Sequence, residues 1–223
     1  MSFKIKGYAV KRQVISKEIV DICREYLLVR RQAAFHLYDT KYLMHETNFA
    51  GSWRDNQVPN TWSIYGDALM EVLLKLIKPK MEKWTEQKLY ETYAYTRIYK
   101  KGDVLDRHKD RPECEISTTL NLGTDPWPIY IEPDQTKGGF IRANKGTIYQ
   151  TANTKGKKID LKPGDMLLYK GEDLEHWREP FAGKTCAQVF LHYTAMKNKS
   201  LKFDGRPSLG LPKCFPEKPW LKL

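Results

Sequence analysis

The spacing of apolar residues divides the chain into a helical part and a part made of short strands. After Ser16, apolar side chains recur three or four positions apart, which places them on one face of an α-helix. Ser16 is a suitable N-cap, because its hydroxyl can accept a hydrogen bond from a free amide of the first turn. The stripe expected to face the core consists of Ile19, Ile22, Cys23 and Tyr26.

A second helix is predicted from about Gly66. Pro79 is expected to end or kink it, because proline lacks the amide donor and its ring clashes with the preceding turn. Between the two helices, residues 36–62 are rich in Asn, Gly, Asp and Pro, which predicts an ordered loop region. The apolar stripe of the second helix consists of Leu69, Val72, Leu73, Leu76 and Ile77.

After Lys88 the pattern changes to short alternating or apolar runs separated by Gly, Pro, Asp and Asn, which is typical of strands. Eight such runs favour a jelly roll, in which two sheets protect their edges and leave a mouth for a ligand. The predicted strands are 93–99, 115–122, 128–132, 139–143, 147–150, 165–169, 175–178 and 187–194.

These elements predict a mainly β fold with N-terminal helices, of the α+β class, in which the helices pack on one sheet of a jelly-roll core. We expect all 223 residues to form a single domain. Residues 1–89 are its mostly helical scaffold, 90–195 its jelly roll, and 196–223, with four prolines, an extended C-terminal arm. A chain of this length buries a sufficient core without disulfides.

Cysteine usage and hydropathy indicate the compartment. Cys23, Cys114, Cys186 and Cys214 lie far apart, with no Cys-x-x-Cys pair, which argues against a disulfide framework and against structural zinc. No secretory leader follows Met1, so we expect a cytoplasmic protein. No apolar run approaches the ~20 residues of a membrane helix, so we expect no membrane association.

The chain carries 38 Lys and Arg against 27 Asp and Glu, a formal net charge of +11. Such an excess attracts polyanions and acidic substrates over long range. The positive charges are scattered, however, and their three modest clusters, at 78–83, 155–158 and 197–202, are shorter than a basic tail. Nucleic-acid binding is therefore not the favoured expectation.

The pattern with the most chemical content is His108-x-Asp110, followed sixty-six positions later by His176. On a strand, residues i and i+2 point to the same side, so His108 and Asp110 are expected to converge. Two neutral imidazoles and one carboxylate on one face of a metal leave three positions open, the arrangement by which non-haem Fe(II) holds a co-substrate and dioxygen. The alternative is a chance triplet, with core or surface histidines.

The sequence around the triad supports the metal site. Four features occur in order, namely Tyr99-x-x-Gly102, the His-x-Asp pair, the turn Pro163-Gly-Asp165 feeding an apolar strand, and His176 followed by Pro180. In this order they resemble the 2-oxoglutarate- and Fe(II)-dependent oxygenases, especially the prolyl 4-hydroxylase-like branch. The resemblance covers roughly residues 90–195.

The resemblance implies a double-stranded β-helix in which His108, Asp110 and His176 ligate Fe(II). It also implies a reaction in which dioxygen oxidatively decarboxylates 2-oxoglutarate to succinate and a C–H bond is hydroxylated. The 2-oxo acid would chelate the iron through its keto oxygen and one carboxylate. The expected prime substrate is a residue of a peptide or an amino-acid-like molecule.

The distal carboxylate of 2-oxoglutarate then needs a cation. The prolyl 4-hydroxylase-like branch usually places a basic residue about ten positions after the second histidine, where this chain has Cys186. Arg178 and Lys184 are the available substitutes. We prefer Arg178, because it lies two residues after His176 and shares its strand face. The alternatives are an ion pair from Arg178 to a neighbouring glutamate and a solvated Lys184.

Further contacts to the co-substrate are expected from the same inner face. Tyr99 matches the position where the family often offers a phenol, and Asn121 lies roughly where this branch tends to carry another tyrosine. Ser117 and Thr119 share the strand phase of Asn121, and ordinary barrel lining is the alternative for each.

Three other polar residues have two interpretations each. Arg97 and Arg111 either hold a carboxylate or phosphate of the substrate or lock Asp110 and Glu113 in place. His192 on the last strand faces the barrel interior, and a satisfied core histidine is the preferred interpretation.

Two functions from other classes compete with the oxygenase. One is a cupin-like metalloprotein that does not use 2-oxoglutarate, and the other is a basic module that binds polyanions. Peptidyl proline, a free amino acid, a modified base and a small secondary metabolite all stay open as prime substrates, because substrate choice depends on the loops around the barrel mouth.

Overall fold

The computed structural model describes residues 3–47, 49–143, 146–197 and 199–213. Its helices are α1 (Phe3–Lys6), α2 (Lys17–Asp39) and α3 (Ala68–Thr85), with 3-10 segments η1 (Pro112–Cys114) and η2 (Lys199–Gly205). Its strands are β1 (Tyr8–Lys11), β2 (Ser63–Tyr65), β3 (Leu89–Lys100), β4 (Leu105–His108), β5 (Ile116–Asn121), β6 (Ile129–Ile131), β7 (Gly139–Ala143), β8 (Gly146–Gln150), β9 (Lys157–Ile159), β10 (Met166–Tyr169), β11 (His176–Arg178) and β12 (Thr185–Ala195).

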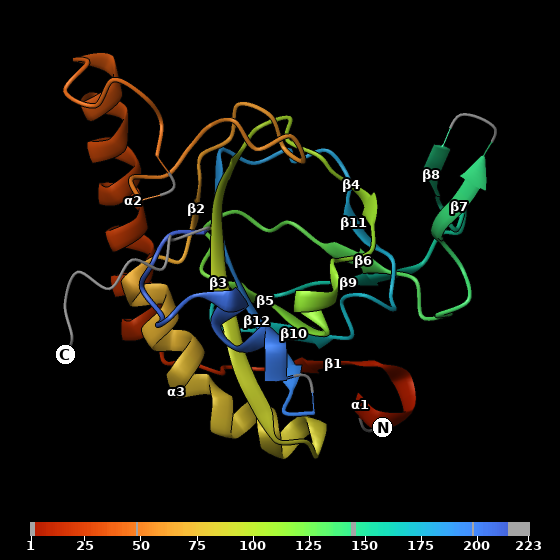
Figure 1. Cartoon of the computed structure of the whole chain (residues 1–223). Helices are drawn as coiled ribbons and strands as arrows, with labels where there is room; N and C mark the ends of the chain where they lie inside the picture. Colours follow the sequence, from red (N-terminus) through yellow and green to blue (C-terminus); the bar gives the residue numbers. More distant parts are fainter. Residues whose placement is uncertain (1–2, 48, 144–145, 198, 214–223) are drawn as a thin grey trace.

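The strands form two facing sheets and a separate hairpin (Figure 1). The larger sheet has six strands in the order β1-β10-β5-β12-β3-β2, and the smaller has four in the order β4-β11-β6-β9. Neighbouring strands in both sheets are antiparallel. β7 and β8 pair with each other and project from the barrel. This arrangement is the predicted jelly roll.

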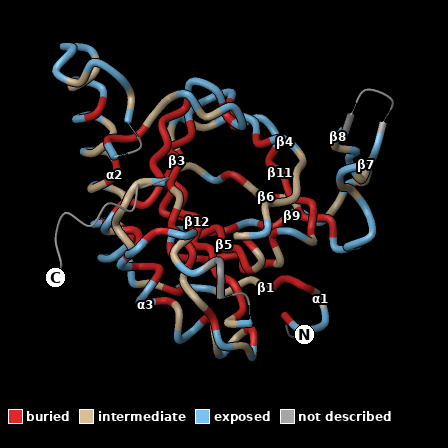
Figure 2. Tube along the Cα trace, viewed as in Figure 1, coloured by how far each residue is buried: buried red, intermediate tan, exposed pale blue. Residues whose placement is uncertain are grey.

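Alternation along the central strands gives the larger sheet two different faces. On β12, Val189 and Leu191 belong to the apolar cluster shared with the helices, whereas Phe190 and His192 line the barrel interior. α2 and α3 lie along the outer face of this sheet (Figure 1). Figure 2 shows that β3, β5 and β12 are buried along most of their length. The helices therefore complete the core without entering the barrel.

All eight predicted strands occur in the structure. The strands β1, β2 and β9 were not predicted, and β4 was expected only as the strand that carries the His-x-Asp pair. Each is only three or four residues long. The sequences of β4 (LDRH) and β9 (KKI) are largely polar and show no hydrophobic alternation. These two segments are strands because they pair with neighbouring strands.

The first long helix begins as predicted but buries a different stripe. The hydroxyl of Ser16 accepts a hydrogen bond from the amide of Ile19 at 3.4 Å, which confirms the N-cap. Ile19 and Ile22, however, are exposed. Apolar residues occupy more than one face of this helix, and packing against the sheet selects between them. The stripe that α2 buries is Val20, Cys23, Leu27 and Ala34.

The second long helix differs from expectation in the same way. Val72 and Leu76 are exposed, and the helix continues through Pro79 to Thr85. Proline removes one backbone hydrogen bond, and the burial of Met81 and Thr85 beyond it offsets that loss. The apolar residues that α3 buries are Met70, Leu73, Leu74, Ile77 and Met81.

The described part of the C-terminal segment is more than an extended arm. Residues 199–205 form η2, which lies against β3. Arg206 then enters the protein and forms a buried ion pair with Glu71 of α3 at 2.6 Å. The rest of the predicted arm, residues 214–223, lies outside the described residues and includes Cys214.

Two further expectations concern the loop region and membranes. α2 extends to Asp39, so the predicted loop of residues 36–62 begins inside the helix. Trp62 at its other end is buried in the core.

Among the described residues, no helix has both the length and the apolar character needed to cross a membrane.

Candidate metal centre

Two neighbouring strands of the smaller sheet bring the predicted histidine ligands together inside the barrel. His108 is the last residue of β4 and His176 the first of β11, and the antiparallel pairing places them directly opposite each other. Their ring centroids are 4.2 Å apart. Strand register alone therefore brings together two residues that are distant in sequence.

The third predicted ligand, Asp110, is positioned by a loop contact and not by strand pairing. We predicted that Asp110 shares a strand with His108, but β4 ends at His108 and Asp110 lies beyond it. The amide of Asp110 donates to the carbonyl of Gly171 at 2.9 Å, which fixes its backbone. A Cβ at position 171 would lie 2.4 Å from Asp110 Oδ2 and from Ser117 Oγ. The close approach that places the carboxylate is thus possible only with glycine.

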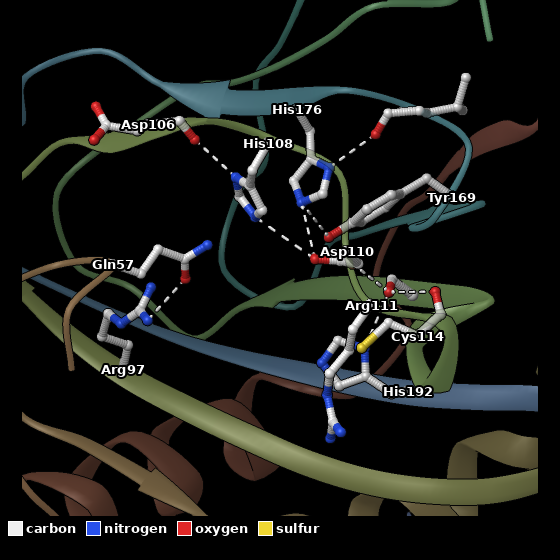
Figure 3. A network of polar contacts seen from close by, with 12 residues as sticks. Gln57, Arg97, Asp106, His108, Asp110, Arg111, Cys114, Tyr169, His176 and His192 are labelled. Atoms are coloured by element: carbon white, nitrogen blue, oxygen red, sulfur yellow. Dashed lines mark hydrogen bonds and ion pairs between the residues drawn. The ribbon is translucent and has the colours of Figure 1, made fainter. Parts of the chain in front are cut away.

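The three side chains point one donor atom each toward a common position (Figure 3). Asp110 Oδ1 lies 3.6 Å from His108 Nε2 and 3.5 Å from His176 Nε2. His108 Nδ1 lies 2.7 Å from the carbonyl of Asp106, and His176 Nδ1 lies 3.0 Å from that of Leu174. Because a carbonyl only accepts, each Nδ1 carries a proton, so Nε2 is the nitrogen of each ring that a metal ion would bind.

The carboxylate is ionised in this environment. Burial raises the pKa of Asp110, but the adjacent His176 and His108 outweigh it and hold the pKa of this carboxyl well below its usual value. The donor set is therefore two imidazole nitrogens and one carboxylate oxygen, all within 4.8 Å of one another. This set, without a thiolate, fits a ferrous ion that keeps open coordination positions.

A cavity of about 380 Å³ adjoins the triad. Tyr169 forms part of its wall, and its hydroxyl lies 3.3 Å from His176 Nε2. Tyr93, Tyr95 and Phe190 give the cavity an aromatic side. The cavity thus provides room beside the metal position for small organic molecules.

Arg178, the preferred anchor for a co-substrate carboxylate, is buried behind the triad on β11. Its Nη1 donates to the carbonyl of Trp127 at 2.5 Å and its Nη2 to the hydroxyl of Thr119 at 3.3 Å. Its Nε has no hydrogen-bond partner in the described part of the chain. Burial lowers the pKa of Arg178, which reflects the cost of holding this cation away from water.

No carboxylate of the described residues pairs with Arg178. The expected alternative, an ion pair to a neighbouring glutamate, does not form: Glu175 pairs with Arg107 at 3.2 Å, and Glu179 accepts from the indole of Trp177 at 2.9 Å. An unpaired buried cation is costly, so the position is suited to an anionic ligand.

The other predicted co-substrate contacts have different surroundings. Tyr99 is buried, and its hydroxyl accepts from Arg97 at 3.1 Å. The amide of Asn121 is already committed, since it donates to the carbonyl of Leu161 at 2.7 Å and accepts from Gln188 at 2.9 Å. Lys184 is exposed. Among the described residues, the cavity beside the triad is lined by none of these three and not by Arg178.

Arg97 and Arg111 both line the cavity, and both have acidic partners. Arg97 forms an ion pair with Asp55. Arg111 pairs with Asp204 at 2.7 Å and with Glu113 at 3.3 Å. The pairing of Arg111 agrees with the interpretation that it locks a neighbouring acid, although the acids are Glu113 and Asp204 and not Asp110.

Sequence reasoning missed several residues of the cavity wall. Asp55 and Gln57 come from the loop before β2, where no periodic pattern predicts which way a side chain points. Tyr169 could have been predicted. It ends a predicted strand and lies on the same strand face as Leu167, which is the face that points into the barrel. Tyr65 also lines the cavity.

His192 also faces this cavity and is nearly enclosed. Its ring packs against Tyr93 with centroids 4.5 Å apart, and its Nδ1 lies 3.0 Å from Ser117 Oγ. Burial lowers the pKa of His192 to about 4, so the ring is neutral near pH 7.

Comparison with solved structures places this geometry in a known fold. HygX from Streptomyces hygroscopicus, with nickel and 2-oxoglutarate bound, is 15% identical over 86% of this chain and 84% of its own, with a TM-score of 0.58. The epimerase SnoN, in complex with Fe3+, alpha ketoglutarate and nogalamycin RO, is 12% identical over 86% and 80%, with a TM-score of 0.60. A Pseudomonas putida prolyl-4-hydroxylase is 10% identical over 85% and 94%, with a TM-score of 0.50.

These likenesses establish the fold. The chain has the jelly-roll fold of the 2-oxoglutarate-dependent enzymes, as the sequence predicted. No protein-family model matches the chain, and no curated protein matches it in sequence. Membership of a prolyl 4-hydroxylase-like branch therefore stays a prediction.

Proposed function

We propose that the protein is a non-haem Fe(II)- and 2-oxoglutarate-dependent dioxygenase. The observation that carries the proposal is the convergence of His108, Asp110 and His176 inside a jelly roll, with one oxygen and two Nε2 atoms facing a common position. The solved structures of HygX with nickel and 2-oxoglutarate, and of SnoN with Fe3+ and alpha ketoglutarate, support this choice of metal and co-substrate.

In this proposal His108 Nε2, His176 Nε2 and Asp110 Oδ1 hold the iron, and 2-oxoglutarate chelates it from the barrel interior. Arg178 binds the distal carboxylate of 2-oxoglutarate, which supplies the anion that the buried guanidinium lacks among the described residues. Tyr169 is close to both groups: its hydroxyl lies 3.3 Å from His176 Nε2, and it interacts electrostatically with Arg178. Lys184, being exposed, is the weaker candidate.

The bound iron supplies the oxidation, in which 2-oxoglutarate, dioxygen and a C–H bond give succinate, carbon dioxide and a hydroxylated product. We propose a residue of a peptide or an amino-acid-like molecule as prime substrate, in line with the resemblance to prolyl 4-hydroxylases. The buried free thiols of Cys23, Cys114 and Cys186 favour a reducing compartment, and we place the enzyme in the cytoplasm.

A two-step experiment tests the function. Anaerobic addition of 2-oxoglutarate to the Fe(II)-loaded protein should produce a visible metal-to-ligand absorption band, and admission of oxygen should then release succinate, slowly without prime substrate. His108→Ala should abolish both signals while the protein stays folded. Folded, fully metallated wild type that gives neither signal contradicts the proposal. A metal-loaded protein that is indifferent to 2-oxoglutarate would instead fit the cupin-like alternative.

A further inference from the structure

Ser117 lies between the metal position and a buried histidine. It is fully buried on β5, and its hydroxyl oxygen is within hydrogen-bond distance of three groups. These are Asp110 Oδ2 at 2.7 Å, His192 Nδ1 at 3.0 Å and the carbonyl of Cys114 at 3.1 Å. A serine hydroxyl has one proton, so these three neighbours compete for a single donor.

The chemistry of the neighbours decides where the proton goes. Asp110 Oδ2 belongs to a carboxylate, a stronger acceptor than a backbone carbonyl or a neutral imidazole nitrogen, and it makes the shortest of the three contacts. Ser117 therefore donates to Asp110 Oδ2. His192 Nδ1 then has no proton to accept from Ser117, so the close contact requires that Nδ1–H donates to the serine oxygen.

We propose that His192 and Ser117 form a hydrogen-bond relay, from Nδ1–H to the serine oxygen and from the serine hydroxyl to Asp110 Oδ2, which positions the carboxylate for ligation through Oδ1 alone. Oδ1 is the oxygen that faces both imidazoles, at 3.6 and 3.5 Å. Engaging Oδ2 keeps the aspartate from chelating with both oxygens, so a coordination position stays free. Ser117 and His192 are positioning residues in this scheme.

The relay also determines what His192 presents to the cavity. With the proton on Nδ1, the Nε2 atom of a neutral imidazole is an acceptor. Nε2 has no hydrogen-bond partner among the described residues, and His192 lines the cavity (Figure 3). A prime substrate would therefore meet an acceptor here, beside the stacked rings of Tyr93 and Tyr65, and would complement it with an N–H or O–H group. This last step rests on the proposed function.

The first test is the tautomer of His192 in the metal-free protein, measured by 15N NMR with assignment through a His192→Asn variant. The relay predicts a neutral ring protonated on Nδ1 in the wild type, with that preference lost in Ser117→Ala. A ring protonated on Nε2 in the wild type overturns the relay. This measurement needs neither metal nor turnover, so it is independent of the oxygenase proposal.

The second test is metal affinity, measured by anaerobic calorimetry with Fe(II). Ser117→Ala should bind Fe(II) about 10-fold more weakly or worse, as expected when a partner of a metal ligand is removed. Thr118→Val is the matched control, because Thr118 lies on the same strand with its buried hydroxyl bonded to the backbone of Leu191, away from Asp110. It should bind Fe(II) within about two-fold of the wild type.

Two variants of His192 separate shape from hydrogen bonding. In His192→Asn the amide N–H takes the place of Nδ1–H, so Fe(II) affinity should fall less than in His192→Phe, which keeps the ring and loses the donor. Equal Fe(II) affinity in Ser117→Ala and Thr118→Val overturns the relay. A wild type that does not bind Fe(II) at all contradicts the oxygenase proposal instead, whatever the NMR tautomer shows.

Discussion

Arg178 is the residue whose charge most restricts what the site can hold. Its guanidinium is enclosed by Trp127, Thr119 and Tyr99, and no acid of the described residues neutralises it. Burying a cation without a partner costs stability, and such a cost is tolerated where a ligand recovers it. Under the proposed function, the free energy lost at Arg178 during folding would be regained when the carboxylate of 2-oxoglutarate binds.

Replacing Arg178 by Met separates folding from co-substrate binding. We expect the metal-free Arg178→Met protein to be at least as stable as the wild type in thermal unfolding, because the cost of burying the charge is removed. Its affinity for 2-oxoglutarate should fall about 30-fold or more, since losing one partner of a buried charged pair costs about 2 kcal/mol or more. Anaerobic titration of the Fe(II)-loaded protein at the charge-transfer band measures this.

The control for Arg178 is Lys184→Met, which removes an exposed cation and should leave 2-oxoglutarate affinity unchanged. If Lys184→Met weakens 2-oxoglutarate binding and Arg178→Met does not, the anchor has been assigned to the wrong cation.

The three residues of the triad were predictable at the residue scale, because the His-x-Asp spacing and the apolar context before His176 are local patterns. Chain spacing alone does not give the hydrogen bonds that orient them. The position of Asp110 depends on the close approach of Gly171, and the side-chain amide of Asn121 is hydrogen-bonded to Leu161 and Gln188. These contacts join segments that are distant in sequence, so no local pattern predicts them. The residue types were therefore readable from the sequence, and their partners were not.

At the scale of elements, the strands were predicted better than the faces of the helices. A strand has two faces, so alternation assigns each residue correctly once the core side is known. A helix such as α2 carries apolar residues on several faces, and only the sheet beneath it decides that Leu27 is buried and Ile22 exposed. The short edge strand β4 exists through its pairing with β11.

The turn before β10 depends on one carboxylate. Asp165 accepts hydrogen bonds from Arg12 at 2.6 Å and from the amides of Gln13 and Lys162 at 3.0 and 2.9 Å. Burial raises the pKa of Asp165, but these donors outweigh it and hold the pKa below its ordinary value of 3.8. The predicted Pro-Gly-Asp turn is thereby tied to the segment that follows β1.

Asp165→Asn should lower the free energy of unfolding by about 1–3 kcal/mol at pH 7, because an amide is a weaker acceptor and leaves a donor unpaired. A carboxylate whose pKa is depressed by folding stabilises the protein above its unfolded pKa, and this stability is lost as pH falls through the folded pKa. The difference between wild type and variant should therefore shrink below about pH 4. Urea unfolding at pH 7 and pH 3 measures it.

Asp160→Asn is the control for this turn, because the Asp160 side chain is largely exposed and should change stability by less than about 0.5 kcal/mol. A difference between wild type and Asp165→Asn that grows on acidification would contradict the account given for Asp165.

At the scale of the whole molecule, a buried ion pair joins the C-terminal segment to the helical layer and the barrel. Glu71 of α3 accepts from Arg206 at 2.6 Å and from the amide of Gly210. Arg206 also donates to the carbonyl of Thr92 on β3 at 3.0 Å. Nearby, Asp204 bonds Arg111 at 2.7 Å, so the same segment supports the cavity wall.

Breaking this pair tests how far the C-terminal segment determines the stability of the whole chain. Arg206→Met should lower the free energy of unfolding by about 3–5 kcal/mol, because it leaves Glu71 buried without its cation. The double variant Glu71→Met/Arg206→Met should be more stable than the sum of the two single changes predicts, since the second removes the charge that the first leaves unpaired. Chemical denaturation of the four proteins in one cycle measures the coupling.

The same variants indicate whether the segment matters to the metal position. The segment reaches the cavity through Lys213, which lines it, and through Asp204, which binds the lining residue Arg111. It does not contact the triad through these residues, because the triad is held by β4, β11 and Gly171. Folded Arg206→Met should therefore still bind Fe(II) with wild-type affinity. Additive single changes would show that the pair is not coupled. Loss of Fe(II) binding in a folded variant would show that the C-terminal segment positions the metal ligands, which the hydrogen bonds of the triad do not predict.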